Sequence, residues 1–284
     1  PDALVGLILD QTLEPLIAKR RDTFKNALGG LRPTDSEDYR RRELDVADPA
    51  EAILGLRVLD PAMGSGHFLV SLVDTLTDHV LDAMAEVAVA GAELDHRSPL
   101  ADEIVKTRNR ILSNARAANW AIEEAQLDDR HIVRRMVLKR CIYGVDKNPM
   151  AVELAKVALW LHTFTVGAPL SFVDHHLRAG DSLFGFWVRD AIDRAESWGG
   201  GQLLYAGPLR EAQSAAAAMQ IIERLTDAEI AEAHQSADTF YGVQQQVAPL
   251  DGFMALLHAL DWLDLKVRED KAAGRAWLDG GFGN

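Results

Sequence analysis

The stretch from residue 56 to residue 69 is a short apolar run that ends in a carboxylate and passes into a glycine-rich turn: Leu56-Arg57-Val58-Leu59-Asp60-Pro61-Ala62-Met63-Gly64-Ser65-Gly66-His67-Phe68-Leu69. Apolar side chains then recur with helical spacing to about residue 90, so the pattern predicts a strand, a loop and a helix. Glycines let a ligand approach the loop backbone, and the start of the helix presents N–H groups that no helical bond uses. The stretch therefore predicts a site for a polar small molecule.

Two common nucleotide-binding loops do not fit this stretch. A phosphate-binding loop requires Gly-Lys-Ser/Thr after four spacer residues, and the dinucleotide fingerprint requires Gly-x-Gly-x-x-Gly. Here Gly64-Ser65-Gly66 is followed by His67, Phe68 and Leu69, so both are disfavoured. A tight turn of the kind found in any α/β protein is the remaining alternative.

The strand-loop-helix pattern recurs further along the chain. Residues 141–145 predict a second buried strand, and a helix follows from Asn148-Pro149 to about Phe164. Residues 176–179 predict a third strand. The alternation predicts an α/β fold, a Rossmann-like open parallel sheet with helices on both faces, together with a helical insertion and a helical C-terminal region.

Each predicted strand ends in or next to a carboxylate. In open parallel sheets, ligands bind outside the carboxyl ends of the strands. We therefore expect three side chains to converge at one edge of the sheet: Asp60, Asp146 and Asp181.

The remaining sequence predicts three parts. Residues 1–50 are expected to form N-terminal helices that pack on the core, with a solvated, charged loop at Gly29–Pro49. Residues 51–188 form the ligand-binding core, with the helical insertion at about 92–140. Residues 189–284 are predicted to be mainly helical.

The composition excludes several classes of protein. The formal net charge of −13 has the wrong sign for a chain whose whole surface binds phosphates, so nucleic-acid contacts must be local or lie elsewhere. No apolar run reaches the roughly 20 residues of a membrane helix. The single Cys141 excludes an internal disulfide and a cysteine-rich zinc site, and with no secretory signal in the sequence we expect a cytoplasmic location. The adjacent His175 and His176 are expected on opposite faces of a strand, so no metal site is predicted.

The segment Asp60–Leu69 resembles the cofactor loop of the N6-adenine DNA methyltransferases, which commonly has the sequence Asp-Pro-Ala-x-Gly-Ser-Gly-x-Phe-Leu. In that family the loop wraps the methionine moiety of S-adenosylmethionine. The resemblance implies cofactor contacts for the following residues: Asp60, Pro61, Ala62, Met63, Gly64, Ser65, Gly66 and Phe68.

The segment Ile142–Lys156 is similar to the second segment of the same family, which places Asp146 and Lys147 at the cofactor. A carboxylate at this strand end can accept both ribose hydroxyls, in hydrogen bonds of roughly 1.5 to 3 kcal/mol each. Asp146 could instead cap the following helix, but Asn148 is better placed to do so, which would leave Asp146 for the ligand.

The segment His175–Leu183 is similar to the family's third segment. The resemblance implies that Asp181 accepts a hydrogen bond from the adenine amino group and that Ser182 and Leu183 also contact the cofactor. Leu183 or Phe184 could pack on the face of the adenine ring. Gly-Asp-Ser is also a common turn, which is the alternative interpretation.

The resemblance implies a DNA adenine-N6 methyltransferase of the restriction-modification or phage-defence kind, and the long insertion before Asp146 is typical of its large members. Expected partners are double-stranded DNA, held mostly by parts outside this chain, and restriction or defence proteins. The family's Asn-Pro-Pro-Tyr/Phe loop is absent from these 284 residues, so we expect a cofactor-binding fragment without catalytic residues. Alternatives are a non-catalytic S-adenosylmethionine-binding or scaffolding subunit, and an enzyme that methylates protein, RNA or small molecules.

Overall fold

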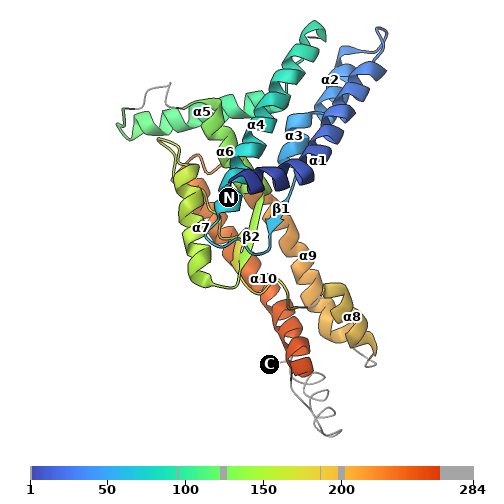
Figure 1. The fold of residues 1–284 in the computed structure, drawn as a ribbon, viewed down its shortest axis with the longest axis vertical. Helices are drawn as coiled ribbons and strands as arrows, with labels where there is room; N and C mark the ends of the chain where they lie inside the picture. The colour runs from blue at the N-terminus through green and yellow to red at the C-terminus, as the bar shows by residue number, and fades with distance from the viewer. Residues whose placement is uncertain (1, 95, 122–126, 186, 198–201, 263–284) are drawn as a thin grey trace, which may run out of the picture. The chain divides into compact units, whose positions relative to one another are not determined.

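The computed structural model describes residues 2–94, 96–121, 127–185, 187–197 and 202–262 (Figure 1). The chain divides into two compact units. The first unit comprises residues 1–180 and 225–234, and the second comprises residues 181–224 and 235–284.

The first unit contains a small open sheet of three parallel strands in the order β1-β2-β3. The strands are β1 (Val58–Asp60), β2 (Ile142–Asp146) and β3 (Leu177–Ala179). All three lie where the sequence predicted them, each beginning one or two residues later than expected. The predicted α/β character is confirmed, although the chain is mostly helical and its sheet is small.

Two helices follow the strands and start at the carboxyl edge of the sheet. Helix α4 (His67–Ala90) follows β1 and α7 (Pro149–His162) follows β2, within about two residues of the predicted ranges. Both helices contact β2 and each other. Asn148 caps α7, because its side-chain oxygen accepts the N–H of Met150 at 3.0 Å. Both βα loops therefore meet near the C-terminal end of β2.

The predicted insertion is helical where it is described. It contains the short η1 (Ala92–Leu94), then α5 (Pro99–Ala117) and α6 (Asp129–Cys141). Helix α6 runs directly into β2, and its buried residues include Val133, Met136 and Val137. The insertion therefore contributes to the core of the first unit.

Three helices precede the sheet: α1 (Asp2–Gly30), α2 (Glu37–Val46) and α3 (Pro49–Leu54). Helix α1 continues through Pro15 and packs beside α4 (Figure 1). The prediction of a loop at Gly29–Pro49 was wrong for α2. Ser36 caps that helix by accepting the N–H of Tyr39, and Leu44 is fully buried. One buried residue among many charged ones is too weak a pattern to reveal a helix.

A buried ion pair ties residues 225–234 to the rest of the first unit. Lys139 of α6 is 1% exposed and Asp227 is fully buried, with Nζ and Oδ1 2.8 Å apart. The other carboxylate oxygen accepts the N–H of Phe172 at 2.8 Å, and Arg135 donates to the carbonyl of Asp227 at 2.7 Å. Burial lowers the pKa of Lys139, and the Asp227 carboxylate opposes that shift.

The second unit contains α8 (Val188–Ser197), α9 (Gln202–Arg224) and α10 (Ile230–Trp262) except the first turn of α10. Its own core includes Ala191, Tyr205 and Phe253. The sequence predicted two helices at 227–241 and 253–271. The structure has one continuous helix instead, and residues 263–271 lie outside the described part. None of the described helices has both the length and the hydrophobicity needed to cross a bilayer.

Candidate functional site

The loop after β1 is held in a tight turn by its own backbone and by Asp60. The Asp60 carboxylate accepts the N–H of Ala62 at 3.0 Å, and the carbonyl of Met63 accepts the N–H of Gly66 at 2.9 Å. Gly64 and Gly66 have φ angles of +54° and +84°, in the left-handed region where a side chain is strained. The turn therefore depends on glycine at both positions.

The two glycines differ in what surrounds them. A Cβ at Gly64 would meet nothing within 4 Å, so the loop backbone faces open space there. A Cβ at Gly66 would lie 3.0 Å from the Cβ and 3.1 Å from the Cα of Ala155 in α7. Gly66 is thus the point where the loop packs closely on the second βα unit.

Met63 fixes the loop to strand β2. Its side chain is 4% exposed and packs against Gly144 of β2, where any Cβ would overlap the Met63 sulfur. Its N–H donates to the carbonyl of Val145 at 3.0 Å. Met63 was predicted at the cofactor, and the structure places its side chain in the core. The role of Gly144 was not predicted from the sequence, although a glycine inside a buried strand is a signal of such close packing.

Asp146 joins the two βα loops. One carboxylate oxygen accepts the N–H of Gly64 at 2.9 Å and the other accepts the N–H of Asn148 at 2.8 Å. The predicted cap by Asn148 is confirmed, and the two backbone bonds to Asp146 were not predicted; the role of Asp146 toward a ligand stays a prediction. Each carboxylate oxygen accepts more than one hydrogen bond, so Asp146 retains acceptor capacity toward a ligand.

Of the other predicted residues in the first two segments, one is half-buried and four are exposed. Phe68 is half-buried and packs on the core from the first turn of α4. The N-cap of α4 is Gly66, which has no side chain to cap that turn. Four further predicted residues are exposed: Pro61, Ala62, Ser65 and Lys147.

The third predicted segment crosses the boundary between the units. Gly180 belongs to the first unit, and its N–H donates to the carbonyl of Asp146 at 3.0 Å. Asp181 begins the second unit, and its carboxylate accepts the N–H of Leu183 at 3.0 Å. Ser182 and Leu183 are exposed. The convergence of Asp181 with the other two aspartates stays a prediction.

His175 and His176 are buried, and their ring centroids lie 3.9 Å apart. They do not point to opposite faces of a strand, because residues 174–176 form a turn that precedes β3. Burial lowers the pKa of His175 to about 2 and that of His176 to about 3, so both rings are neutral at physiological pH. No group of three or more His, Cys, Asp or Glu side chains within the described part of the chain is arranged to hold a metal ion.

The chain is distantly related to a curated protein of Methanocaldococcus jannaschii that is described as a putative type II restriction enzyme and methyltransferase. The two sequences are 24% identical over 210 residues, which cover 68% of this chain and 15% of that protein. The chain therefore spans a small part of its relative's length. No protein-family model and no solved structure matches it.

Proposed function

We propose that the chain is the S-adenosylmethionine-binding part of a DNA adenine-N6 methyltransferase from a restriction-modification or phage-defence system. We further propose that its sheet is one half of a Rossmann-like sheet, with functional divisions at residues 1–50, 51–188 and 189–284. The observation that carries the proposal is the bond from Gly64 to Asp146. This bond joins the two segments that resemble methyltransferase segments, through residues that are 82 positions apart in the sequence.

The residues of this edge fit the cofactor. The open space over Gly64 leaves room for a ligand against the backbone, and the Asp146 carboxylate has acceptor capacity for ribose hydroxyls. The uncapped first turn of α4 suits a carboxylate such as that of a methionine moiety. In the proposal, residues 60–66 and Phe68 hold the methionine part, and Asp146 and Lys147 hold the ribose.

The proposed adenine-side contacts are those of Asp181, Ser182 and Leu183. The cofactor supplies a methyl group on a sulfonium. The task of this chain is to fix the orientation of that group, since transfer to an amine depends chiefly on alignment of the reacting atoms. The bonds that lock the loop to β2 provide this rigidity.

The test is isothermal titration of S-adenosylmethionine into the chain and into an Asp146→Asn variant. The amide keeps the shape of the side chain but loses the charge and one acceptor, so it also removes one of the two bonds that Asp146 accepts from Gly64 and Asn148. Loss of one charge-assisted hydrogen bond costs about 1.5–3 kcal/mol, which weakens binding roughly 10- to 150-fold. The control is Asp10→Asn, an exposed position on α1. Equal affinities for the two variants would contradict the role of Asp146.

A second candidate is a cofactor-binding subunit that does not itself transfer methyl groups. It is favoured by the net charge of −13 and by the lack of any Pro-Pro pair in these 284 residues. An assay with methyl-labelled cofactor and adenine-containing duplex DNA separates the two functions. Binding of the cofactor without transfer of label by the intact gene product supports the second candidate.

A further inference from the structure

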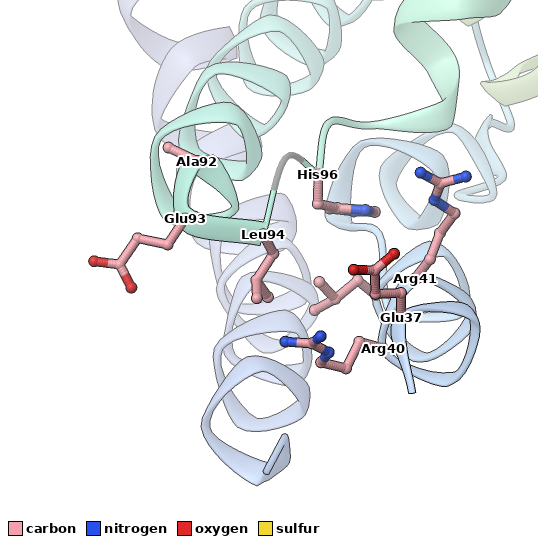
Figure 2. Close-up of a pocket in the computed structure, with 8 residues that line it drawn as sticks. Glu37, Arg40, Arg41, Ala92, Glu93, Leu94 and His96 are labelled. Carbon is pink, nitrogen blue, oxygen red and sulfur yellow. The ribbon is translucent and has the colours of Figure 1, made fainter. Parts of the chain in front are cut away.

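A cavity of about 390 Å³ in the first unit does not favour a ligand of either charge. It lies between α2 and η1, and its lining includes Arg40 and Arg41 as well as Glu37 and Glu93 (Figure 2). The two positive and two negative groups balance each other. A clearer sign of a partner lies on α7, in the same unit.

Helix α7 carries apolar side chains on two opposite sides. Three residues on its inner side are buried in the core: Val152, Ala155 and Leu159. Four residues on its outer side are between 46% and 74% exposed: Met150, Leu154, Val157 and Leu161. Phe164, just after the helix, is 55% exposed. A helix that is apolar all round is normally buried all round, so the outer face of α7 is expected to contact a partner.

The spacing of the four outer residues indicates which partner fits. They follow one another at intervals of four, three and four positions, as in the seam of a coiled coil. This order of intervals is the same in both directions along the helix. A second copy of α7 in antiparallel orientation therefore sets Met150 against Leu161 of the second copy, and Leu154 against its Val157. The chain itself supplies the matching row of apolar side chains.

The charged residues beside the seam are compatible with this pairing. Glu153 is exposed, and its Oε1 lies 2.8 Å from the Nζ of Lys156 on the same helix. In the antiparallel arrangement the two copies of Glu153 are five residues out of step, about 7.5 Å along the axis, so they do not face each other directly. The other side of the seam carries the half-buried Ala151 and Ala158, and small side chains allow the helices to approach closely.

We propose that the outer face of α7 is the interface of a two-fold symmetric homodimer of this chain. Its four outer residues and Phe164 expose on the order of 100 Å² each, so a pair of copies buries about 1,000 Å², the lower limit for a specific interface. Each copy carries a net charge of −13, and repulsion between the copies opposes association. We therefore expect a weak dimer, with a dissociation constant of about 10–100 μM. The proposed cofactor-binding function is not a premise of this inference.

The test is sedimentation equilibrium of the 284-residue chain at concentrations from about 5 to about 500 μM. The mass should rise from 31.2 kDa toward twice that value as the concentration increases. The dimer should become more stable when the salt concentration is raised to about 0.5 M, because salt screens the repulsion between the net charges and leaves the apolar contact intact.

Val157→Glu places a charge in the middle of the seam and should weaken association at least about tenfold. The matched control is Val105→Glu on α5. Val105 has the same exposed fraction as Val157, 46%, so the control adds the same charge at an equally exposed valine away from the seam. It should associate within about twofold of the unchanged chain.

Near-ultraviolet circular dichroism establishes that both variants are folded. The proposal is overturned if the unchanged chain stays at 31.2 kDa over the whole concentration range, or if Val157→Glu and Val105→Glu associate alike.

Discussion

Replacing Gly66 with alanine tests the packing that joins the two βα units. The φ of +84° costs an alanine about 1–2 kcal/mol, because the left-handed conformation brings Cβ against the carbonyl oxygen. The new Cβ would also lie 3.0 Å from the Cβ and 3.1 Å from the Cα of Ala155. Neither atom can rotate away, so α7 must shift, at about 1–3 kcal/mol for an overpacked site. We therefore expect a loss of roughly 2–5 kcal/mol in the free energy of unfolding.

The assay is urea unfolding followed by tryptophan fluorescence, with Trp160 on α7 as a probe within the first unit. Gly64→Ala is the matched control. Its φ of +54° carries the same conformational penalty, but its Cβ would meet nothing within 4 Å. The control should lose only about 1–2 kcal/mol. If Gly66→Ala is no more destabilising than Gly64→Ala, the close packing of the loop on α7 is refuted.

Three other predictions concern buried groups. Asp227→Asn leaves the ammonium of Lys139 buried without its carboxylate and should cost about 3–5 kcal/mol in urea unfolding, and a loss below about 1 kcal/mol would contradict the pair. Burial raises the pKa of Asp48 above its ordinary 3.8, so the Asp48 carboxylate binds a proton more readily in the folded chain than in the unfolded chain. The free energy of unfolding of the unchanged chain, relative to that of Asp48→Asn, should therefore rise as the pH falls from about 7 to about 4. If this difference stays flat or falls, the raised pKa of Asp48 is contradicted. Gly144→Ala should cost about 1–3 kcal/mol by displacing Met63, and a double-mutant cycle with Met63→Ala should show strong coupling between the two positions.

The helices and strands that were predicted correctly are those whose ends are marked by residues in or next to them. An apolar run followed by Asp60 and glycines marks the end of β1 and the start of α4. Asn148 followed by proline marks the start of α7 in the same way. Helix α2 escaped prediction because its only buried residue is Leu44, and its remaining residues resemble a charged loop.

The remaining features depend on contacts between distant residues. Nothing near Asp146 in the sequence shows that its carboxylate holds Gly64, and nothing near Asp227 shows that it pairs with Lys139. Such bonds arise only when the fold brings the segments together. The same holds for the close approach of Gly66 to Ala155.

A crystal structure of the chain grown with S-adenosylmethionine, or with its demethylated product, would show whether the cofactor binds at the glycine loop and Asp146. We expect the ligand to lie over Gly64–Gly66 with its ribose hydroxyls about 2.5–3.0 Å from the Asp146 carboxylate oxygens. A ligand bound elsewhere on the chain, or one that makes no contact with either Asp146 or the glycine loop, would show that this edge of the sheet is not the cofactor site.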